Sequence, residues 1–523
     1  MAELSASGHR FAIATPHAAA TEAGAAAIDA GGNAVDAILA AAATLAVVYP
    51  HMCGVGGDLF ALVREPEGRT VVVNASGAAP TAVDPAGLRA AHGAMPVHGP
   101  HPVTVPGAVS GWWQLAEHWS ALGFTQALEP AIALAREGVP VARSVAAELA
   151  THGERLLEDP GIAEVFAPSG RPLGQGERLV QPALARTLEA IAGQGPAALY
   201  GGEIGRSLVE RLRDLASPIA LEDLEAHEAE LDSPLTGRFG DLDVSVPPPN
   251  SQGFVLLQIL ACVGHLELDP DPFGSDAGAL ARVFRVTADD RDRHNADPRQ
   301  ARVPVGTLVD DGHIAALCDA VRDPAIPIGP PGPRGDTTGL VAVDGDGLAV
   351  GLIQSLYDGF GSGILEPRTG IVLHNRGAGF SLDPSHPNAI GPGKRPAHTL
   401  MPVVVQREGR LSAVSGTMGG AAHPQINATV LIRSLTLGSR ASEAVAAPRW
   451  LVGGLSDERS AVVVAEPGVP EPVRRSLRGA GFTVEELEPL SEAVGHASLV
   501  RVGEDRLLDA GADPRSDGAA AAR

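Results

Sequence analysis

The amino-acid sequence predicts an α+β fold in which helices pack on a pair of mostly antiparallel sheets. Segments of helical pattern are followed by segments of strand pattern and then by helix again, an order typical of such folds. The chain has 523 residues, of which 45% are hydrophobic and 19% charged, as in globular proteins with one large core or several domains. Apart from the C-terminal end, only residues 329–336 have the Gly/Pro composition of a linker. We therefore expect that linker to lie inside one fold.

The first part of the chain is predicted to be mainly helical around a short strand region. Residues 17–49 indicate two Ala-rich helices that are broken at residues 31–33. A Gly-rich turn at residues 53–60 leads to strand-like segments that end in residues 71–80. From about residue 106 to residue 215, apolar residues recur at spacings of three and four, which predicts amphipathic helices.

The second part is predicted to contain most of the strands. Residues 246–260, VPPPNSQGFVLLQIL, indicate a rigid loop that enters a helix, because proline does not fit inside either regular element. Strands dominate residues 338–405, and a later helix is expected at residues 426–437. Residues 511–523 have the composition of a disordered tail.

Net charge and cysteine content disfavour several kinds of partner and site. The formal net charge of −23 at pH 7 argues against nucleic acid and anionic membranes, since both are bound through Lys/Arg patches. Three cysteines without CxxC spacing argue against a disulfide framework and a thiolate metal site. The N-terminus lacks a secretory pattern, and the apolar stretch 37–48 is too short to span a bilayer. We expect a cytoplasmic protein without a cofactor.

Thr337 is the strongest candidate for a catalytic residue. It follows the stretch GPPGPRGD and begins an apolar run that ends in a turn at residues 344–347. Asp-Gly between apolar runs is a hairpin signal, and a tip at residues 345 and 346 pairs Thr337 with Gln354, next to Ser355. A threonine freed at its backbone nitrogen has a hydroxyl nucleophile and, with a reference pKa of about 8, an amine base. The alternative is a threonine that merely starts a strand.

Three further loops carry residues suited to substrate binding. Gly419 and Gly420, between a strand and a helix, would direct backbone N–H groups at an oxyanion, although a tight turn or a phosphate nest fits the same pattern. His398 and Thr399 lie between a proline and a strand, where His398 would orient a substrate or be a satisfied loop histidine. Arg376, in a Gly-rich loop, would clamp a carboxylate or form a surface ion pair.

The carboxylate-rich segment ADDRDRHNADP, residues 288–298, is interpreted as a salt-bridged segment rather than a metal site. Its one histidine is interleaved with arginines. The sequence also lacks the HExxH, EF-hand, Rossmann and kinase motifs.

Six segments carry more information together than singly: HAAATEAGAAAIDAGGNAVDA with YPHMCGVGGDLF, TVPGAVSGW, DTTGLVAVDGDGLAV, GFGSGI, GKRPAHTLMP and GTMGGAAHPQ. In order and spacing they resemble the γ-glutamyltransferase family, from His17 to Leu499. The resemblance implies an αββα sandwich of the N-terminal nucleophile hydrolase type, made as one precursor that cleaves itself between Asp336 and Thr337. Residues 1–336 would then form the large subunit and residues 337–523 the small subunit of one interlocked domain, with further dimerisation left open.

The resemblance also implies roles for the residues of the site. Thr337 becomes the nucleophile and, through its new amine, the base. Ser355 falls on the position of a family threonine whose hydroxyl supports the nucleophile. Gly419 and Gly420 match the family's oxyanion hole.

The substrate pocket departs from the family pattern. Members that act on γ-glutamyl compounds hold the glutamate group with an Arg, an Asn, an acidic/amide pair and two serines. These positions fall here on Ser76, Tyr357, Arg376 with Gly379, and His398 with Thr399. The α-ammonium group of a γ-glutamyl substrate would lose its carboxylate partner, because Arg376 and Gly379 stand at the positions of the acidic/amide pair. An unpaired buried charge costs several kcal/mol. Glutathione is therefore an unfavourable substrate.

The segments QSLY, FGSG, HNRG, KRPxHT and GTMGG are similar to a signal-less branch of the family that includes oxamate amidohydrolase-type enzymes. We predict an amidohydrolase or acylase that acts through an acyl-enzyme on a small-molecule substrate such as an oxo-acid amide. Arg376 would pair with the substrate carboxylate, and Tyr357, His398 and Thr399 would offer neutral hydrogen bonds. The alternatives are a γ-glutamyl hydrolase or transferase acting on glutathione-like substrates, a homologue that cleaves C–C bonds, and a binding protein that never matures.

Overall fold

Two antiparallel sheets form the centre of the molecule. A computed structural model describes residues 3–323, 336–453 and 461–523. Within these residues each large sheet has seven strands, and their pairings are antiparallel. The order of the first sheet is β1 (Ser5–Gly8), β20 (Leu508–Ala512), β19 (His496–Val502), β15 (Arg410–Met418), β14 (Val403–Arg407), β9 (Leu242–Val246) and β8 (Leu235–Phe239). The order of the second is β21 (Ala519–Ala522), β2 (Phe11–Thr15), β10 (Asp336–Asp344), β11 (Ala349–Tyr357), β3 (Asp58–Arg64), β4 (Thr70–Ala75) and β7 (Glu230–Asp232).

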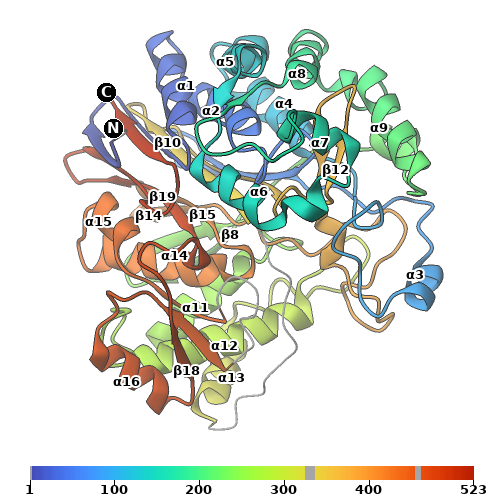
Figure 1. Ribbon diagram of the computed structural model, residues 1–523. Coiled ribbons are helices and arrows are strands. Elements are labelled where there is room, and N and C mark those ends of the chain that lie inside the picture. The colour runs from blue at the N-terminus through green and yellow to red at the C-terminus, as the bar shows by residue number, and fades with distance from the viewer. Residues whose placement is uncertain (1–2, 324–335, 454–460) are drawn as a thin grey trace.

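Helices cover the outer face of each sheet, so the predicted αββα sandwich is confirmed (Figure 1). The second sheet is covered by α1 (Ala18–Asp29), α2 (Ala34–Val48) and α4 (Ala108–Trp119). Outside them α5 (Phe124–Glu137) packs on α2 and α8 (Pro182–Gln194) on α5, and α6 (Arg143–Leu156) shares the same core. The first is covered by α11 (Gly253–His265), α14 (His423–Leu431) and α15 (Ala441–Ala446), with α12 (Ala277–His294) and α13 (Asp311–Arg322) packed outside α11. Small apolar side chains, among them Ala12, Val341 and Val414, fill the space between the sheets.

The remaining elements lie at the periphery of the sandwich. The helices are α3 (Pro85–Ala91), α7 (Pro160–Phe166), α9 (Glu203–Asp214), α10 (Leu221–Glu225) and α16 (Glu471–Gly479). The short strands are β5 (Val139–Pro140), β6 (Arg178–Leu179), β12 (Ile364–Glu366), β13 (Ile371–Leu373), β16 (Trp450–Val452), β17 (Val462–Ala465) and β18 (Thr483–Glu486). In the described part of the chain, no helix combines the length and apolarity needed to cross a bilayer.

The break between the first two helices has a local cause. Gly31 adopts a φ of 93°, a conformation that costs glycine little. The Asn33 side chain then accepts hydrogen bonds from the N–H groups of Val35 and Asp36, while Asp36 accepts one from the Asn33 N–H at 2.9 Å. This reciprocal capping starts α2, and the predicted break at residues 31–33 is confirmed.

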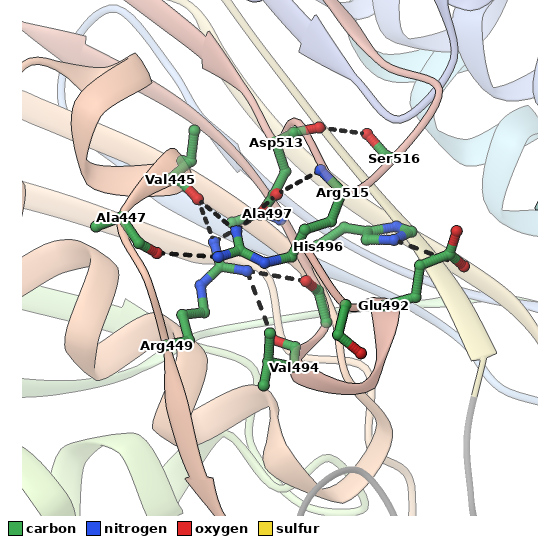
Figure 2. Close-up of polar contacts among 12 residues, drawn as sticks. Val445, Ala447, Arg449, Glu492, Val494, His496, Ala497, Asp513, Arg515 and Ser516 are labelled. Atoms are coloured by element: carbon green, nitrogen blue, oxygen red, sulfur yellow. Dashed lines mark hydrogen bonds and ion pairs between the residues drawn. The ribbon is translucent and has the colours of Figure 1, made fainter. Parts of the chain in front are cut away.

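The C-terminal end is ordered, so the predicted disordered tail at residues 511–523 is wrong. β21 pairs with β2 at the edge of the second sheet. Figure 2 shows Asp513 near Arg515 and Arg449: its Oδ1 accepts from Arg515 at 2.9 Å and its Oδ2 from Arg449 at 2.6 Å. All three side chains are buried. The alanine-rich composition that suggests disorder instead supplies the small side chains of an edge strand.

Strands from both sides of the Asp336–Thr337 bond are interleaved in each sheet. In the first sheet, β20 lies between β1 and β19, and β14 lies beside β9. In the second, β10 and β11 lie between β2 and β3. Neither half of the sequence therefore has a sheet of its own.

We expect buried His51 to make stability depend on pH. Burial lowers its pKa to about 3, and neither ring nitrogen has a hydrogen-bond partner among the described residues. In the unfolded chain the same group binds a proton near pH 6.5, so the free energy of unfolding should fall as pH drops from there towards 3. In His51→Leu this fall should be shallower by up to about 1 kcal/mol per pH unit.

Denaturant unfolding at several pH values between about 7.5 and 4.5 measures this slope. The same substitution at exposed His9 is the control. Equal slopes for the His51 variant and the wild type would contradict the prediction.

Candidate active site

Thr337 and Ser355 meet at the open end of the β10–β11 hairpin. The Thr337 Oγ1 donates a hydrogen bond to the Ser355 Oγ at 3.2 Å, and the Ser355 Oγ accepts another from the Tyr357 N–H at 2.7 Å. Both hydroxyl-bearing side chains are buried. The hairpin therefore brings the Thr337 and Ser355 hydroxyls together, as its sequence predicts.

The predicted register of this hairpin is off by one residue. Gln354 pairs with Thr338 rather than Thr337, and a bulge separates Thr338 from Asp336, which pairs with Tyr357. Two features cause the difference. The tip spans residues 345–347, because the Asp344 N–H bonds to the Leu348 carbonyl at 3.0 Å, and the bulge leaves Thr337 outside the regular ladder. The stretch before it, residues 329–335, lies outside the described residues.

Gly419 and Gly420 lie on the facing sheet near the start of β10. They connect β15 to the short 3₁₀ turn that precedes α14. The two sheets approach closely here, since a Cβ added to Gly339 would lie 2.5 Å from the Thr417 nitrogen. Gly420 has a φ of 53°, which favours glycine. This close approach places Thr337 in the neighbourhood of the Gly419–Gly420 turn.

A cavity of about 220 Å³ is lined by Tyr357 and Ala421, which follow Ser355 and Gly420 in the chain; among the described residues its lining does not include Thr337, Ser355, Gly419 or Gly420. Its lining includes the predicted Tyr357, Arg376, His398 and Thr399, together with Ala421, the neighbour of Gly420. The predicted residues of the substrate pocket are thus brought together, with one exception.

That exception is Ser76, which does not line the cavity among the described residues. Its Oγ donates to the Asn74 Oδ1 at 2.7 Å and accepts from the Asn250 Nδ2 at 3.1 Å. The Ser76 side chain is fully buried, and its hydroxyl is engaged by Asn74 and Asn250.

Arg376 is a buried cation at the cavity wall. Its guanidinium carbon lies 3.8 Å from the centre of the Tyr357 ring, and its Nη1 donates to the Thr399 Oγ1 at 3.3 Å. The Arg376 Nε and the Tyr357 hydroxyl have no hydrogen-bond partner among the described residues. Burial lowers the pKa of Arg376 but leaves a cation at neutral pH. A buried cation with a spare donor is suited to bind an anion.

Tyr357 supports this arrangement with an unusual backbone. Its φ of 82° is uncommon for a bulky residue and persists only where the surroundings fix it. Burial raises the pKa of its hydroxyl, so the phenol stays protonated and can donate.

His398 is held by the protein at both ring nitrogens. Its Nδ1 accepts from the Leu400 N–H at 3.3 Å, which leaves Nε2 to donate to the Asp58 Oδ2 at 3.0 Å. Burial lowers the pKa of His398 to about 4, so the ring is neutral near pH 7. The expected hydrogen bond from His398 to substrate is not available in this arrangement, because both nitrogens are engaged.

Asp58 anchors this side of the pocket. Besides His398, it accepts from the Gly77 N–H at 3.1 Å and lies 3.6 Å from the His374 Nδ1. Burial alone would raise the pKa of Asp58, but His374 and His398 outweigh it and lower the pKa. The pocket therefore has a fixed anion behind His398.

Sequence reasoning missed three lining residues at the C-terminal end of α12. Arg291, Asp292 and Asn295 all face the cavity. They fall within residues 288–298, and the expected salt bridge is present, since the Arg291 Nε donates to the Asp292 Oδ1 at 2.9 Å. The available signal was the spacing of Arg291 and Asn295, which puts both on one helical face. In the described parts of the chain, no cluster of His, Cys, Asp and Glu is suited to hold a metal.

Comparison with known proteins gives a consistent result. Residues 20–523 match the family described as Gamma-glutamyltranspeptidase. The chain is 39% identical to the oxamate amidohydrolase proenzyme of Klebsiella pneumoniae, over 98% of both chains. It is 35% identical to the glutathione hydrolase-like YwrD proenzyme of Bacillus subtilis, over 97% of both. The crystal structure of cephalosporin acylase from Bacillus halodurans superposes with a TM-score of 0.92 at 30% identity, over 99% of this chain and 97% of that one.

Proposed function

The chain belongs to the gamma-glutamyltranspeptidase family and is an amide hydrolase of the N-terminal nucleophile class, and from that premise we propose that Thr337 is its nucleophile. The observation that carries the proposal is the 3.2 Å hydrogen bond between the Thr337 and Ser355 hydroxyls. A neighbouring hydroxyl that accepts this hydrogen bond orients the Thr337 oxygen for attack.

Maturation would use the same hydroxyl. The Thr337 Oγ1 attacks the carbonyl carbon of Asp336, the C–N bond breaks, and the Asp336 acyl group moves to oxygen as an ester. Water then hydrolyses this ester, which leaves residues 1–336 with a new carboxylate and Thr337 with a free α-amine. That amine, with a reference pKa of about 8, is the base that Thr337 otherwise lacks.

Turnover follows by acyl transfer. The α-amine accepts the proton of the Thr337 hydroxyl as its oxygen attacks the substrate carbonyl, and the Gly419 and Gly420 N–H groups bind the oxyanion. The proton passes to the leaving amine, and the acyl group stays on Thr337 as an ester. Water hydrolyses the ester and regenerates the hydroxyl.

The substrate we propose is a small amide with a carboxylate next to the reacting carbonyl, such as oxamate. Arg376 and Tyr357 both line the cavity, and the Arg376 guanidinium would bind the carboxylate, with the Tyr357 hydroxyl as a further donor. The cavity of about 220 Å³ is below the ~300–1,000 Å³ of pockets for drug-sized ligands. Oxamate amidohydrolase activity in the relative named above agrees with this size and charge.

A γ-glutamyl substrate fits this cavity less well. Asp292 is the lining carboxylate that an α-ammonium group would need, but its Oδ1 already bonds Arg291 at 2.9 and 2.8 Å. Arg376 would meanwhile face the ammonium group as a like charge.

Ammonia release from oxamate, compared with a γ-glutamyl amide and a neutral amide, tests the proposed substrate. We expect the highest kcat/KM for oxamate. Release of acid without ammonia or amine from a carbonyl substrate would instead indicate C–C cleavage. Equal turnover of the three amides would contradict the proposed role of the carboxylate.

Ser355→Ala should lower kcat about 10- to 100-fold with little change in KM, because a positioned proton partner of the nucleophile is lost. Ser355→Thr keeps the hydroxyl and should retain most of the activity. Single-turnover acylation rates measure the effect. A kcat in Ser355→Ala equal to that of the wild type would remove Ser355 from the mechanism.

A further inference from the structure

We propose that Gln252 is a positioning residue that couples the substrate-binding loop to the oxyanion loop; this inference rests on the proposed function. Gln252 directly precedes α11, and its side chain is fully buried. Its Nε2 donates to the Thr399 carbonyl at 2.9 Å and to the Gly420 carbonyl at 3.0 Å. One side-chain amide therefore bonds to the loop that carries His398 and Thr399 and to the turn that follows Gly419.

The substrate-binding loop, residues 396–400, is held by three consecutive side chains. The Asn250 Nδ2 donates to the Pro396 carbonyl at 2.9 Å, the Ser251 Oγ to the Leu400 carbonyl at 2.6 Å, and Gln252 to Thr399. The backbones also pair here, since the Gln252 N–H bonds to the His398 carbonyl at 3.0 Å. This loop has no regular element of its own, so its shape depends on residues 250–252.

The oxyanion loop, residues 419–421, is held at three consecutive carbonyls. The Gly419 carbonyl accepts from the Ala422 N–H at 2.9 Å, and the Ala421 carbonyl accepts from Arg291 at 3.2 Å. The Gly420 carbonyl accepts from Gln252 and from the His423 N–H. Arg291 also donates to the Gln252 Oε1 at 3.3 Å. Two adjacent glycines have wide backbone freedom. The Gly419 carbonyl shares a planar peptide with the Gly420 N–H, so its bond to Ala422 orients that donor, while Gln252 holds the peptide that follows Gly420.

Orientation of the N–H groups is what an oxyanion hole requires before the reaction starts. Loss of one such donor typically lowers kcat by a factor of about 100 to 1,000. Loss of Gln252 would leave both donors present but remove one anchor of the peptide that follows Gly420, so their orientation would be held less firmly and we expect an intermediate effect. KM should change little, because the direct contacts of Arg376 and Tyr357 with substrate remain.

Gln252→Met removes the donor and keeps the side-chain length, and Gln258→Met is its matched control. Gln258 lies in α11, the helix that Gln252 precedes, and is equally buried. It donates its Nε2 to the Asp290 carboxylate at 2.7 Å and the Leu308 carbonyl at 2.9 Å. We expect kcat for oxamate to fall about 30-fold in Gln252→Met, with KM within about threefold. The Gln258 variant should keep its kcat within about threefold even where its melting temperature falls.

Gln252→Glu separates hydrogen bonding from packing. An ionised glutamate keeps the contact with Arg291 but cannot donate to the two carbonyls, whereas a protonated one can. The rate of this variant relative to wild type should therefore rise as pH falls, while the relative rate of Gln252→Met stays flat. If Gln252 had a purely structural role, the relative rates of Gln252→Glu and Gln252→Met would not differ in their pH dependence.

The activated ester p-nitrophenyl acetate makes this test independent of the natural amide, because it reports acylation of a matured nucleophile. A wild type that reacts with the ester but not with oxamate would refute the proposed substrate. The role of Gln252 would still be tested by comparing the ester rates of wild type and Gln252→Met. Equal ester rates in wild type and Gln252→Met, or a loss seen only in KM, would overturn the proposed role. A wild type that reacts with neither would overturn both proposals.

Discussion

Thr337→Ala is expected to leave the chain uncut and to lower amide turnover at least about 10⁴-fold, because one substitution removes the oxygen that attacks both the backbone and the substrate. Denaturing electrophoresis should show one band for the variant and two for wild type, the larger ending at residue 336. Ammonia release from oxamate measures the loss of turnover.

Thr338 provides the matched control for this experiment. It is the next residue, equally buried, and its Oγ1 donates to the Gln354 carbonyl at 3.1 Å rather than to Ser355. Thr338→Ala should still cleave itself and keep its kcat within about tenfold. Thr337→Ser, which retains a hydroxyl, should also cleave. Two bands in Thr337→Ala would show that another residue performs the cleavage and would remove the basis of the proposed mechanism.

Arg376→Met is expected to lower kcat/KM for oxamate by about 3 kcal/mol, roughly 100-fold, because the substrate carboxylate would be buried without its cation. A neutral amide of similar size lacks that charge and should lose little. The difference between the two substrates isolates the ionic contact from any general disturbance of the pocket.

Arg433 is a suitable control for Arg376. Its guanidinium carbon also lies over an aromatic ring, 4.1 Å from the centre of Phe273, but it lies outside the lining of the proposed substrate cavity. Arg433→Met should therefore leave the preference for oxamate unchanged. An equal loss for oxamate and the neutral amide in Arg376→Met would indicate that Arg376 shapes the pocket without binding the carboxylate.

Much of the fold could be predicted from the sequence, because local signals determine it. The Asp-Gly turn predicts the hairpin that brings Thr337 to Ser355, and the Gly-Gly-Asn break predicts α1 and α2. The exact register could not be predicted, since the length of the tip and the bulge at Thr337 depend on contacts across two sheets.

Residues placed by tertiary packing were also the ones that sequence reasoning missed. In the sequence, Arg291 and Asn295 resemble the polar residues found at many helix ends. Only the packing of α12 shows that they line the cavity. The alanine-rich C-terminal end has the composition of a tail, and composition alone does not reveal that β2 pairs with it. His398 was expected to bind substrate, but its two nitrogens already bond Leu400 and Asp58.

The interleaving of strands in both sheets has a consequence for the renaturation of a cleaved molecule. Folding of the uncut chain is unimolecular, but once the Asp336–Thr337 bond is broken, β10 and β11 must find β2 and β3 on a separate polypeptide. Recovery after denaturation then becomes a second-order reaction whose yield falls on dilution. Thermal inactivation of the cleaved form would therefore be governed by the rate of unfolding. The chain would have to fold before it is cut, because the two separated polypeptides would not refold efficiently.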